Sequence, residues 1–159
     1  VYDQRPVEAR EDVLVYTTPP LETDLEVTGP VVARLFASTD GRDTDFTAKL
    51  VDVFPDGTAW NLCDGIVRGR YRTGRGPAEL LTPGEVYEFE IDLWVTSNVF
   101  KAGHRIRVEI SSSNFPRFDR NLNTGDPIGD DASPRRAQQT VLHDAERPSH
   151  IVLPVIPAT

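Results

Sequence analysis

At 159 residues, of which 38% are hydrophobic, the chain has the size and composition of about one globular domain with a buried core. Its 25 acidic residues outnumber the 17 basic ones and give a formal net charge of −8, which disfavours nucleic acids and anionic membranes as partners because both call for a basic surface. No apolar run approaches the ~20 residues that a membrane helix needs, so we expect no membrane span.

Four apolar runs in the first two thirds of the chain predict β-strands. The runs at 31–38 and 46–54 are apolar on both faces, which is typical of central strands. The runs at 87–95 and 104–112 alternate apolar and polar residues, as a strand with one buried face does.

A fifth run, 151–156, contains Pro154, which cannot donate a ladder hydrogen bond and therefore favours an edge position. Turn-forming sequences such as Pro55-Asp56-Gly57 separate the runs. Helical periodicity is weak, and the sequence allows only one short helix, within 132–140. With about eight short strands, we predict an all-β sandwich or jelly roll.

Two of the runs carry opposite charges on one side. If the two strands are neighbours, cross-strand ion pairs would form on an exposed face, each worth roughly 0.2–1 kcal/mol. Two separate solvated faces are the other interpretation. The residues concerned are Arg68, Arg70 and Arg72 on one run and Glu88, Glu90 and Asp92 on the other.

The stretch 113–136 shows no clear strand or helix. Loops longer than about 12–15 residues are uncommon in compact domains and are usually functional or disordered. Because this one contains Phe115, Phe118 and Ile128, we expect an ordered loop that packs on other parts of the protein.

Nucleophilic catalysis has little support in the sequence. The motif Gly-x-Ser-x-Gly is absent. His104 follows a glycine at a predicted strand start, which indicates a turn or rim position, and His143 and His150 flank a proline-containing turn. Cys63 has no histidine near it in sequence, so we expect an inert buried thiol. We predict no catalytic residue in this chain.

Two oxygen-rich stretches raise the question of calcium. One stretch partly follows the ligand spacing of an EF-hand loop, but its glycine comes one residue late and no flanking helices are expected. Asx turns and backbone caps are the alternative, and we favour it. We predict no metal and no cofactor, while the sequence leaves calcium open at both stretches. Their oxygen-bearing residues are Asp40, Asp43 and Asp45 in one, and Asp119, Asn121, Asn123 and Asp130 in the other.

Exposed aromatic residues are the third kind of candidate site. Trp60, Trp94 and Tyr71 could form a platform for a sugar, and Trp94 falls on the polar face of its strand. Large exposed aromatics also mark contacts with another domain. A stand-alone carbohydrate-binding sandwich is therefore one hypothesis for the chain.

Several ordered strings nevertheless resemble a known family. They run through the whole chain and include Asp3-Gln4-Arg5-Pro6, Asp43-Thr44-Asp45-Phe46-Thr47-Ala48-Lys49-Leu50-Val51-Asp52-Val53, Asp64-Gly65-Ile66-Val67-Arg68, Thr96-Ser97-Asn98-Val99-Phe100, Ser111-Ser112-Ser113-Asn114-Phe115-Pro116, Asp119-Arg120-Asn121 and Pro148-Ser149-His150-Ile151-Val152-Leu153-Pro154. Together they resemble the C-terminal non-catalytic domain of X-Pro dipeptidyl-peptidase-type serine hydrolases, with the bacterial cocaine esterase branch the most similar.

The resemblance implies a jelly-roll (galactose-binding-like) β-sandwich that spans 1–159 as a single domain at the C-terminal end of a larger protein. Such a domain packs against an α/β-hydrolase domain, which holds the Ser–Asp–His triad, and helps to wall the substrate cleft. Whole enzymes of the family hydrolyse acyl esters or amides, and some remove X-Pro dipeptides. The chain alone is then no enzyme, and the hydrolase domain of the same protein is its partner.

The resemblance and the long loop meet at one prediction. We expect the loop to contact the hydrolase domain or its cleft, since contact function concentrates on loops of rigid sandwiches. The alternative is that it folds back on its own sandwich as an omega loop. Homo-oligomer formation stays open, and so does the compartment, with cytoplasm favoured over secretion. The residues are Asn114, Phe115, Pro116, Phe118, Asp119 and Asn121.

Overall fold

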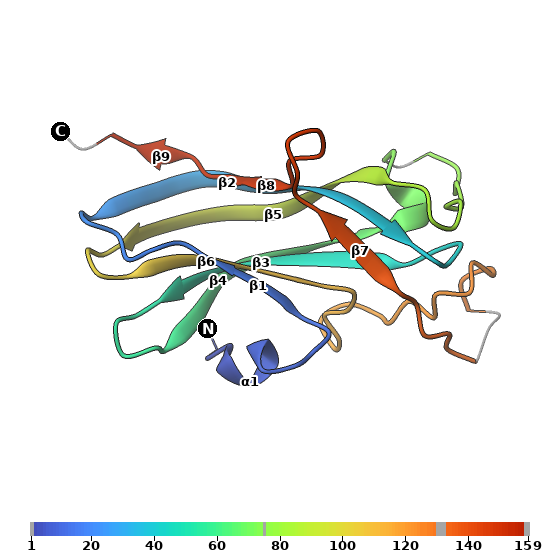
Figure 1. Ribbon diagram of the computed structural model, residues 1–159, viewed down its shortest axis with the longest axis horizontal. Coiled ribbons are helices and arrows are strands. Elements are labelled where there is room, and N and C mark those ends of the chain that lie inside the picture. Colours follow the sequence, from blue (N-terminus) through green and yellow to red (C-terminus); the bar gives the residue numbers. More distant parts are fainter. Residues whose placement is uncertain (1, 75, 130–132, 158–159) are drawn as a thin grey trace.

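Two antiparallel sheets stack face to face in the computed structural model, which describes residues 2–74, 76–129 and 133–157 (Figure 1). The first, sheet A, has the order β1–β6–β3–β4. Its strands are β1 (Leu14–Thr17), β6 (Arg105–Ser111), β3 (Asp45–Val53) and β4 (Ala59–Arg68).

Sheet B is built around one long strand. β2 (Leu25–Thr39) pairs along one edge with β5 (Tyr87–Phe100). Along its other edge it pairs in turn with β7 (Gln139–Leu142), β8 (His150–Val152) and β9 (Val155–Ile156). Most paired strands are not consecutive in the chain, because successive strands cross between the sheets, as they do in jelly rolls.

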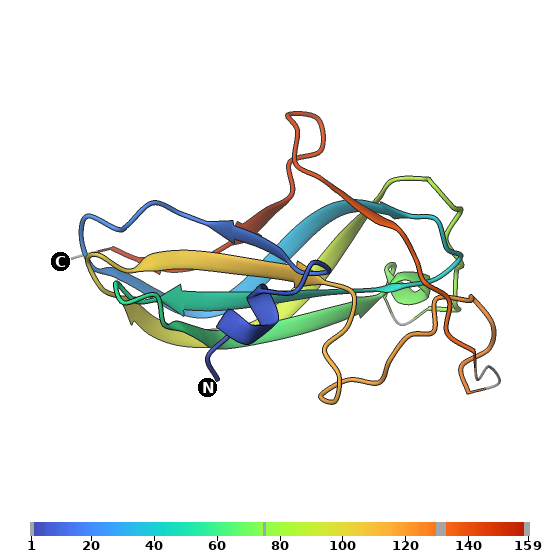
Figure 2. The same ribbon diagram turned by 60° about the horizontal axis from the view of Figure 1, so that its bottom comes forward.

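Only short helical segments interrupt the strands in the described residues. The helix α1 (Arg5–Glu8) lies across the outer face of sheet A (Figure 2), and the 3₁₀ turn η1 (Gly69–Tyr71) follows β4. Pro6 lies in the first turn of α1, where its missing N–H breaks no helical hydrogen bond. No described helix is long and apolar enough to span a bilayer.

The core lies between the sheets and is filled from the alternating positions. Phe46 on β3 packs on Phe89 on β5, with ring centroids 4.8 Å apart. Leu50, Ile91 and Leu93 are completely buried beside them. Burial of each such side chain stabilises the fold by about 1.5–3 kcal/mol. Because these residues come from β3 and β5, their contacts hold the two sheets together.

The predicted all-β sandwich is confirmed, and each of the five predicted runs forms strand. The last run divides into β8 and β9 around Pro154, at an edge of sheet B as expected. The short strands β1 and β7 have too few alternating residues to be noticed in the sequence. The helix suggested within 132–140 is wrong for the described part: residues 133–138 are irregular, β7 begins at Gln139, and Ala132 lies outside the described residues.

The proposed pairing between the arginine run and the glutamate run is also wrong. β4 ends at Arg68, and it belongs to sheet A, whereas β5 belongs to sheet B. Glu88 and Glu90 instead pair with Arg34 on the neighbouring strand β2, at 3.1 and 3.0 Å.

Strand β5 contains a bulge that changes which residues face the core. Pro30 pairs with Val95 and Val32 with Asp92, so two residues of β5 lie opposite one residue of β2. Trp94 in the bulge has a φ of +68° and is 67% exposed. Beyond it the alternation reverses, and Val95, predicted on the buried side, is exposed.

Candidate functional site

The loop at 113–124, which leaves sheet A after β6, is fastened to the outer face of that sheet by polar side chains. Figure 2 shows it as the orange segment that hangs below the sandwich. Two groups of its residues are anchored, one on Asp64 and one on Asp45, and the exposed apex lies within the first group.

The first anchor is the carboxylate of Asp64 on β4. Asn114 Nδ2 donates to Asp64 Oδ2 at 2.5 Å, and Arg117 donates to Oδ1 of the same carboxylate. Asp64 is buried, so its two hydrogen bonds replace the water that it loses. One buried carboxylate therefore fixes both ends of the segment 114–117.

The second anchor is a network around Asp45 on β3. Arg68 binds both Asp45 oxygens, at 2.9 and 3.0 Å, and reaches Asp119 Oδ2 at 3.2 Å. Asn121 Nδ2 bridges Asp43 and Asp45 at 2.9 and 2.7 Å. Burial raises the pKa of Asp45, an effect that Arg68 and Asn121 oppose. The Asp45 carboxylate in turn raises the pKa of Arg68, which stays charged.

The apex, which lies within the segment that Asp64 fixes, presents apolar surface to solvent. Phe115 is 70% exposed and Pro116 is exposed beside it. Phe118 is half-buried and lines, with Tyr71 and Arg68, a cavity of about 280 Å³. The loop thus folds back on its own sandwich through polar groups and leaves an aromatic side chain outside.

The predicted loop residues therefore divide by role. Asn114, Asp119 and Asn121 join the two anchors, Phe118 lines the small cavity, and Phe115 and Pro116 face outward. Asp64 and Arg68 hold the loop, and the sequence did not predict either of them in this role. They lie about 50 positions away in the chain, and no local pattern links them to it.

The acidic residues weighed as calcium ligands are bound to arginines. Asp43 accepts from Arg70 Nε at 2.8 Å, and Asp40 accepts from Arg135 at 3.0 Å and from the Gln138 N–H at 2.9 Å. In the described ranges no three His, Cys, Asp or Glu side chains are grouped to hold a metal ion. Asp130 lies outside those ranges.

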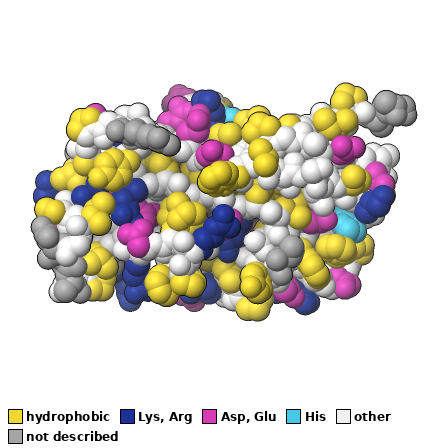
Figure 3. All heavy atoms as spheres, turned by 180° about the vertical axis from the view of Figure 1, so that it is seen from behind, with side chains coloured by type: hydrophobic (Ala, Val, Ile, Leu, Met, Phe, Trp, Pro, Cys, Tyr) yellow, Lys and Arg dark blue, Asp and Glu magenta, His cyan; other side chains and the backbone are white. Residues whose placement is uncertain are grey.

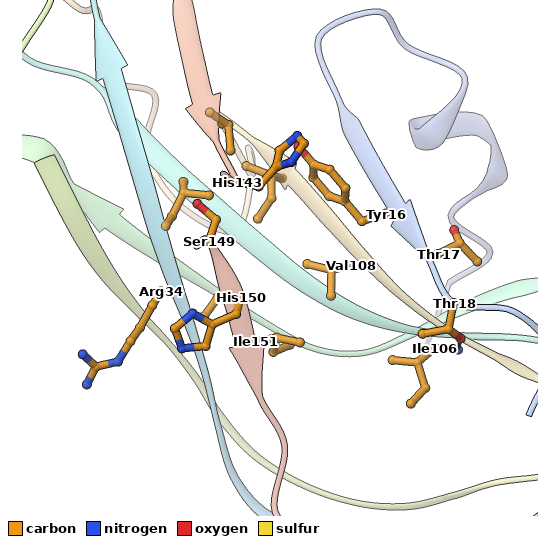
Figure 4. Close-up of a pocket in the computed structure, with 14 residues that line it drawn as sticks. Tyr16, Thr17, Thr18, Arg34, Ile106, Val108, His143, Ser149, His150 and Ile151 are labelled. Atoms are coloured by element: carbon orange, nitrogen blue, oxygen red, sulfur yellow. Dashed lines mark hydrogen bonds between the residues drawn. The ribbon is translucent and has the colours of Figure 1, made fainter. Parts of the chain in front are cut away.

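A larger apolar cavity, of about 420 Å³, opens between the two sheets where β1, β7 and β8 lie (Figure 4). Tyr16, Val108, Val141 and Ile151 supply much of its lining. In the close-up Arg34 points away from the opening, so the interior offers few polar groups.

The serine and histidines beside this cavity make structural contacts. Ser149 Oγ donates to the Leu142 carbonyl at 2.5 Å and accepts from the Phe36 N–H at 2.8 Å, which joins β2 to the hairpin before β8. His143 packs edge-on against Tyr16, with ring centroids 5.8 Å apart. No described histidine hydrogen-bonds to Ser149, so the residues do not form a nucleophile–base pair.

His104 and Cys63 are two further residues for which the sequence predicted a position. His104 closes the turn before β6, as expected, because its N–H donates to the Lys101 carbonyl at 2.9 Å, but its side chain is buried, with Nδ1 2.9 Å from Asp52 Oδ1. Cys63 is buried as expected, and burial together with Asp64 raises the pKa of its thiol to about 11. Its reactive thiolate form is therefore scarce at neutral pH.

The aromatic residues considered for sugar binding do not meet as one platform. Among the described residues the ring contact of Trp60 is to Phe54, at 6.2 Å, while Trp94 lies on β5 of the other sheet and Tyr71 lines the small cavity. On the face shown in Figure 3, hydrophobic side chains are interspersed with charged ones.

Comparisons with known proteins show which proteins this chain is similar to. The family described as the X-Pro dipeptidyl-peptidase C-terminal non-catalytic domain matches residues 1–152. Cocaine esterase of Rhodococcus sp. (strain MB1 Bresler) is 56% identical over 97% of this chain and 27% of its own length. In the structures of an aminopeptidase from a marine sediment archaeon (Thaumarchaeota) and of an α-amino acid ester hydrolase, similar domains cover 98% of this chain with a TM-score of 0.93, at 43% and 36% identity. The chain spans about a quarter of each of these proteins.

Proposed function

Because this chain belongs to the family of X-Pro dipeptidyl-peptidase C-terminal non-catalytic domains, we propose that it is a single accessory domain, spanning 1–159, of a larger serine hydrolase. In this proposal it packs on an α/β-hydrolase domain of the same protein and helps to wall the substrate cleft. The whole protein hydrolyses acyl esters or amides, which include X-Pro dipeptides in some relatives.

One observation carries the assignment of the contact surface: an exposed phenylalanine sits on a loop that is held rigidly from beneath. A loop that is already held in place loses little conformational entropy on binding, and exposed aromatic residues are enriched at interfaces. Phe115 is exposed on such a loop, since Asp64 binds Asn114 and Arg117, which flank Phe115 and Pro116. We infer that Phe115 inserts into the hydrolase domain.

The names of the relatives support the proposed reaction class. They include an esterase, an ester hydrolase and an aminopeptidase, and all of these break acyl bonds. Each is about four times longer than this chain, which leaves room for a catalytic domain outside it. The engagement of Ser149 and His143 in structural contacts favours a nucleophile elsewhere in the protein.

The test is Phe115→Ala in the intact protein that carries this chain. Removing a hot-spot ring should weaken docking by about 2 kcal/mol or more. We expect the calorimetric unfolding transition of this domain to separate from that of the hydrolase domain, and kcat/KM for an aryl ester to fall. Asp119→Ala, which removes one contact of the second anchor, should act in the same direction but more weakly.

Ile156→Ala is the matched control, because Ile156 is an exposed apolar residue on β9, far from the loop (Figure 1). It should leave both the unfolding transition and kcat/KM unchanged. If Phe115→Ala behaves like Ile156→Ala, the loop does not contact the hydrolase domain, and the omega-loop interpretation replaces the proposal.

A further inference from the structure

A buried pair of carboxyl groups lies beneath the N-terminal segment, on the outer face of sheet A. Glu109 on β6 is only 2% exposed, and the side chain of Glu8, the last residue of α1, is 10% exposed. Arg107 and Lys49, which flank Glu109 on sheet A, bind Glu8 and Gln4 of the N-terminal segment, and these contacts place the Glu8 carboxyl over Glu109. The helix therefore covers one buried acid with a second acid.

The neighbouring cations hydrogen-bond to only one of the four carboxyl oxygens of this pair. Arg107, on the same strand as Glu109, donates to Glu8 Oε2 at 2.6 Å. Lys49 on β3 is 3.6 Å from Glu109 Oε2, and it donates its hydrogen bond to Gln4 Oε1 at 2.8 Å instead. Glu109 thus faces an ammonium group without a direct hydrogen bond from it.

The other neighbouring strands add no donor to Glu109. From β4, Asp64 is the cross-strand neighbour of Lys49, and its carboxylate is taken by the 113–124 loop. From β1, the cross-strand neighbour of Glu109 is the apolar Val15. Glu8, Lys49, Arg107 and Asp64 are therefore the charged groups that border this buried acid.

Within the described residues, three buried oxygens of the pair have no hydrogen-bond partner: Oε1 of Glu8 and both carboxyl oxygens of Glu109. Ionised carboxylates are acceptors only, so two of them facing each other repel. A proton on one carboxyl turns it into a donor to the other. Burial and the charge of Glu8 raise the pKa of Glu109 to about 7, against the opposing effect of Lys49.

We propose that Glu8 and Glu109 form a proton-sharing latch, which holds the N-terminal segment at 4–9 on sheet A in weakly acidic solution and loosens it above neutral pH. Both acids supply acceptors, and the shared proton supplies the donor that fastens α1 to β6. When the proton leaves, two like charges remain in a buried site, and undocking of α1 lets water solvate them.

The direction of the pH effect follows from the docked state. Docking raises the pKa of Glu109 above its ordinary value of 4.5. The stabilisation of the docked segment is therefore complete below that value and is lost as the pH rises through about 7. The latch acts on the segment itself, so it is independent of any hydrolytic activity.

Hydrogen exchange followed by mass spectrometry on the intact protein tests the latch. The reporters are the α1 amides of Val7, Glu8 and Ala9, which donate to Gln4 and Arg5 carbonyls. After correction for intrinsic exchange, their protection should fall about tenfold or more between about pH 5 and about pH 8, since one unit of pKa difference corresponds to a factor of ten. In Glu109→Gln, a neutral side chain of the same shape, this fall should disappear.

Glu90→Gln is the control, because it removes the same charge from an exposed site on β5 and should keep the fall in protection. Glu8→Gln provides a second variant should Glu109→Gln fold poorly, and its amide should donate to Glu109 and shift the transition to lower pH. The proposal would be overturned if protection of α1 did not change with pH. It would also be overturned if this protection fell equally in the wild type, in Glu109→Gln and in Glu8→Gln.

Discussion

The ion pairs of this domain differ in how much water surrounds them, and that difference decides how much each pair contributes to the stability of the fold. Asp43 and Arg70 are both buried, and Asp43 also accepts from the backbone N–H of Arg70 at 2.9 Å. Asp24 and Lys101 form a pair at the surface, at 2.6 Å against 2.8 Å for the buried pair. The mutual attraction is strong only where water is absent, but there each partner also depends on the other for solvation.

Asp43→Ala should therefore lower the free energy of unfolding by about 3–5 kcal/mol, because it leaves the Arg70 guanidinium buried without its counter-ion. Asp24→Ala is the control and should have a much smaller effect, since water solvates Lys101. Urea denaturation of the two variants measures both values. Equal losses would show that burial does not govern these pairs.

At the scale of the strand, the bulge in β5 is a local departure that changes a whole face. Trp94 adopts a left-handed backbone conformation that is rare for a bulky residue, and its N–H is held by Asp92 Oδ1 at 2.8 Å. The strain is tolerated because the extra residue lets Phe100 face the core while Leu93 also does.

Glycine adopts this conformation without strain, so Trp94→Gly should leave the free energy of unfolding unchanged or raise it by up to about 1 kcal/mol. Val95→Gly, at the next exposed position, should lower it by about 1 kcal/mol, because glycine weakens a strand. Thermal unfolding followed by circular dichroism distinguishes the two. A comparable loss in both variants would mean that Trp94 is not strained.

The bulge also shows where prediction from the sequence reaches its limit. Period-2 alternation located the strand at 87–95, but alternation carries no sign of one extra residue, so Val95 was placed on the wrong face. The prediction that the two charged runs pair failed for a related reason. Spacing tells which residues share a face, whereas the topology decides which strands are neighbours.

The candidate site was predicted in part. The apolar residues of the loop predicted that it is ordered, and its contact with another domain stays a prediction. Its anchors are carboxylates on β3 and β4, held there by partners far away in sequence, and such contacts exist only once the sheets have formed. The buried pair of Glu8 and Glu109 is of the same kind, since Arg107, 99 positions downstream of Glu8, binds it and so brings β6 beneath the helix.

For the whole molecule, the two long sides of the sandwich are different. On one side β4 of sheet A packs against β5 of sheet B, and a Cβ added at Gly65 would lie 2.0 Å from the Asp92 carbonyl oxygen. On the other side the sheets separate around the apolar cavity beneath Tyr16. The sandwich is therefore closed along one side and open along the other.

Gly65→Ala tests the closed side. Because the obstacle is backbone rather than a flexible side chain, the sheets must move apart, and we expect a loss of about 3 kcal/mol or more in the free energy of unfolding. Gly76→Ala, with open space around its Cβ position, should be nearly neutral. Chemical denaturation of both variants gives the comparison, and a small loss for Gly65→Ala would mean that the two sheets are not in close contact there.

The distribution of lysine has a practical consequence for labelling. Lys49 and Lys101 are the only lysines of the chain. The Lys49 side chain is 13% exposed and its amine is held by Gln4, whereas that of Lys101 is 61% exposed in the turn that leads from β5 to β6. Among the side chains of this domain, amine-selective dyes should therefore react with Lys101. Immobilisation through the same amine should fix the domain to a surface in one orientation.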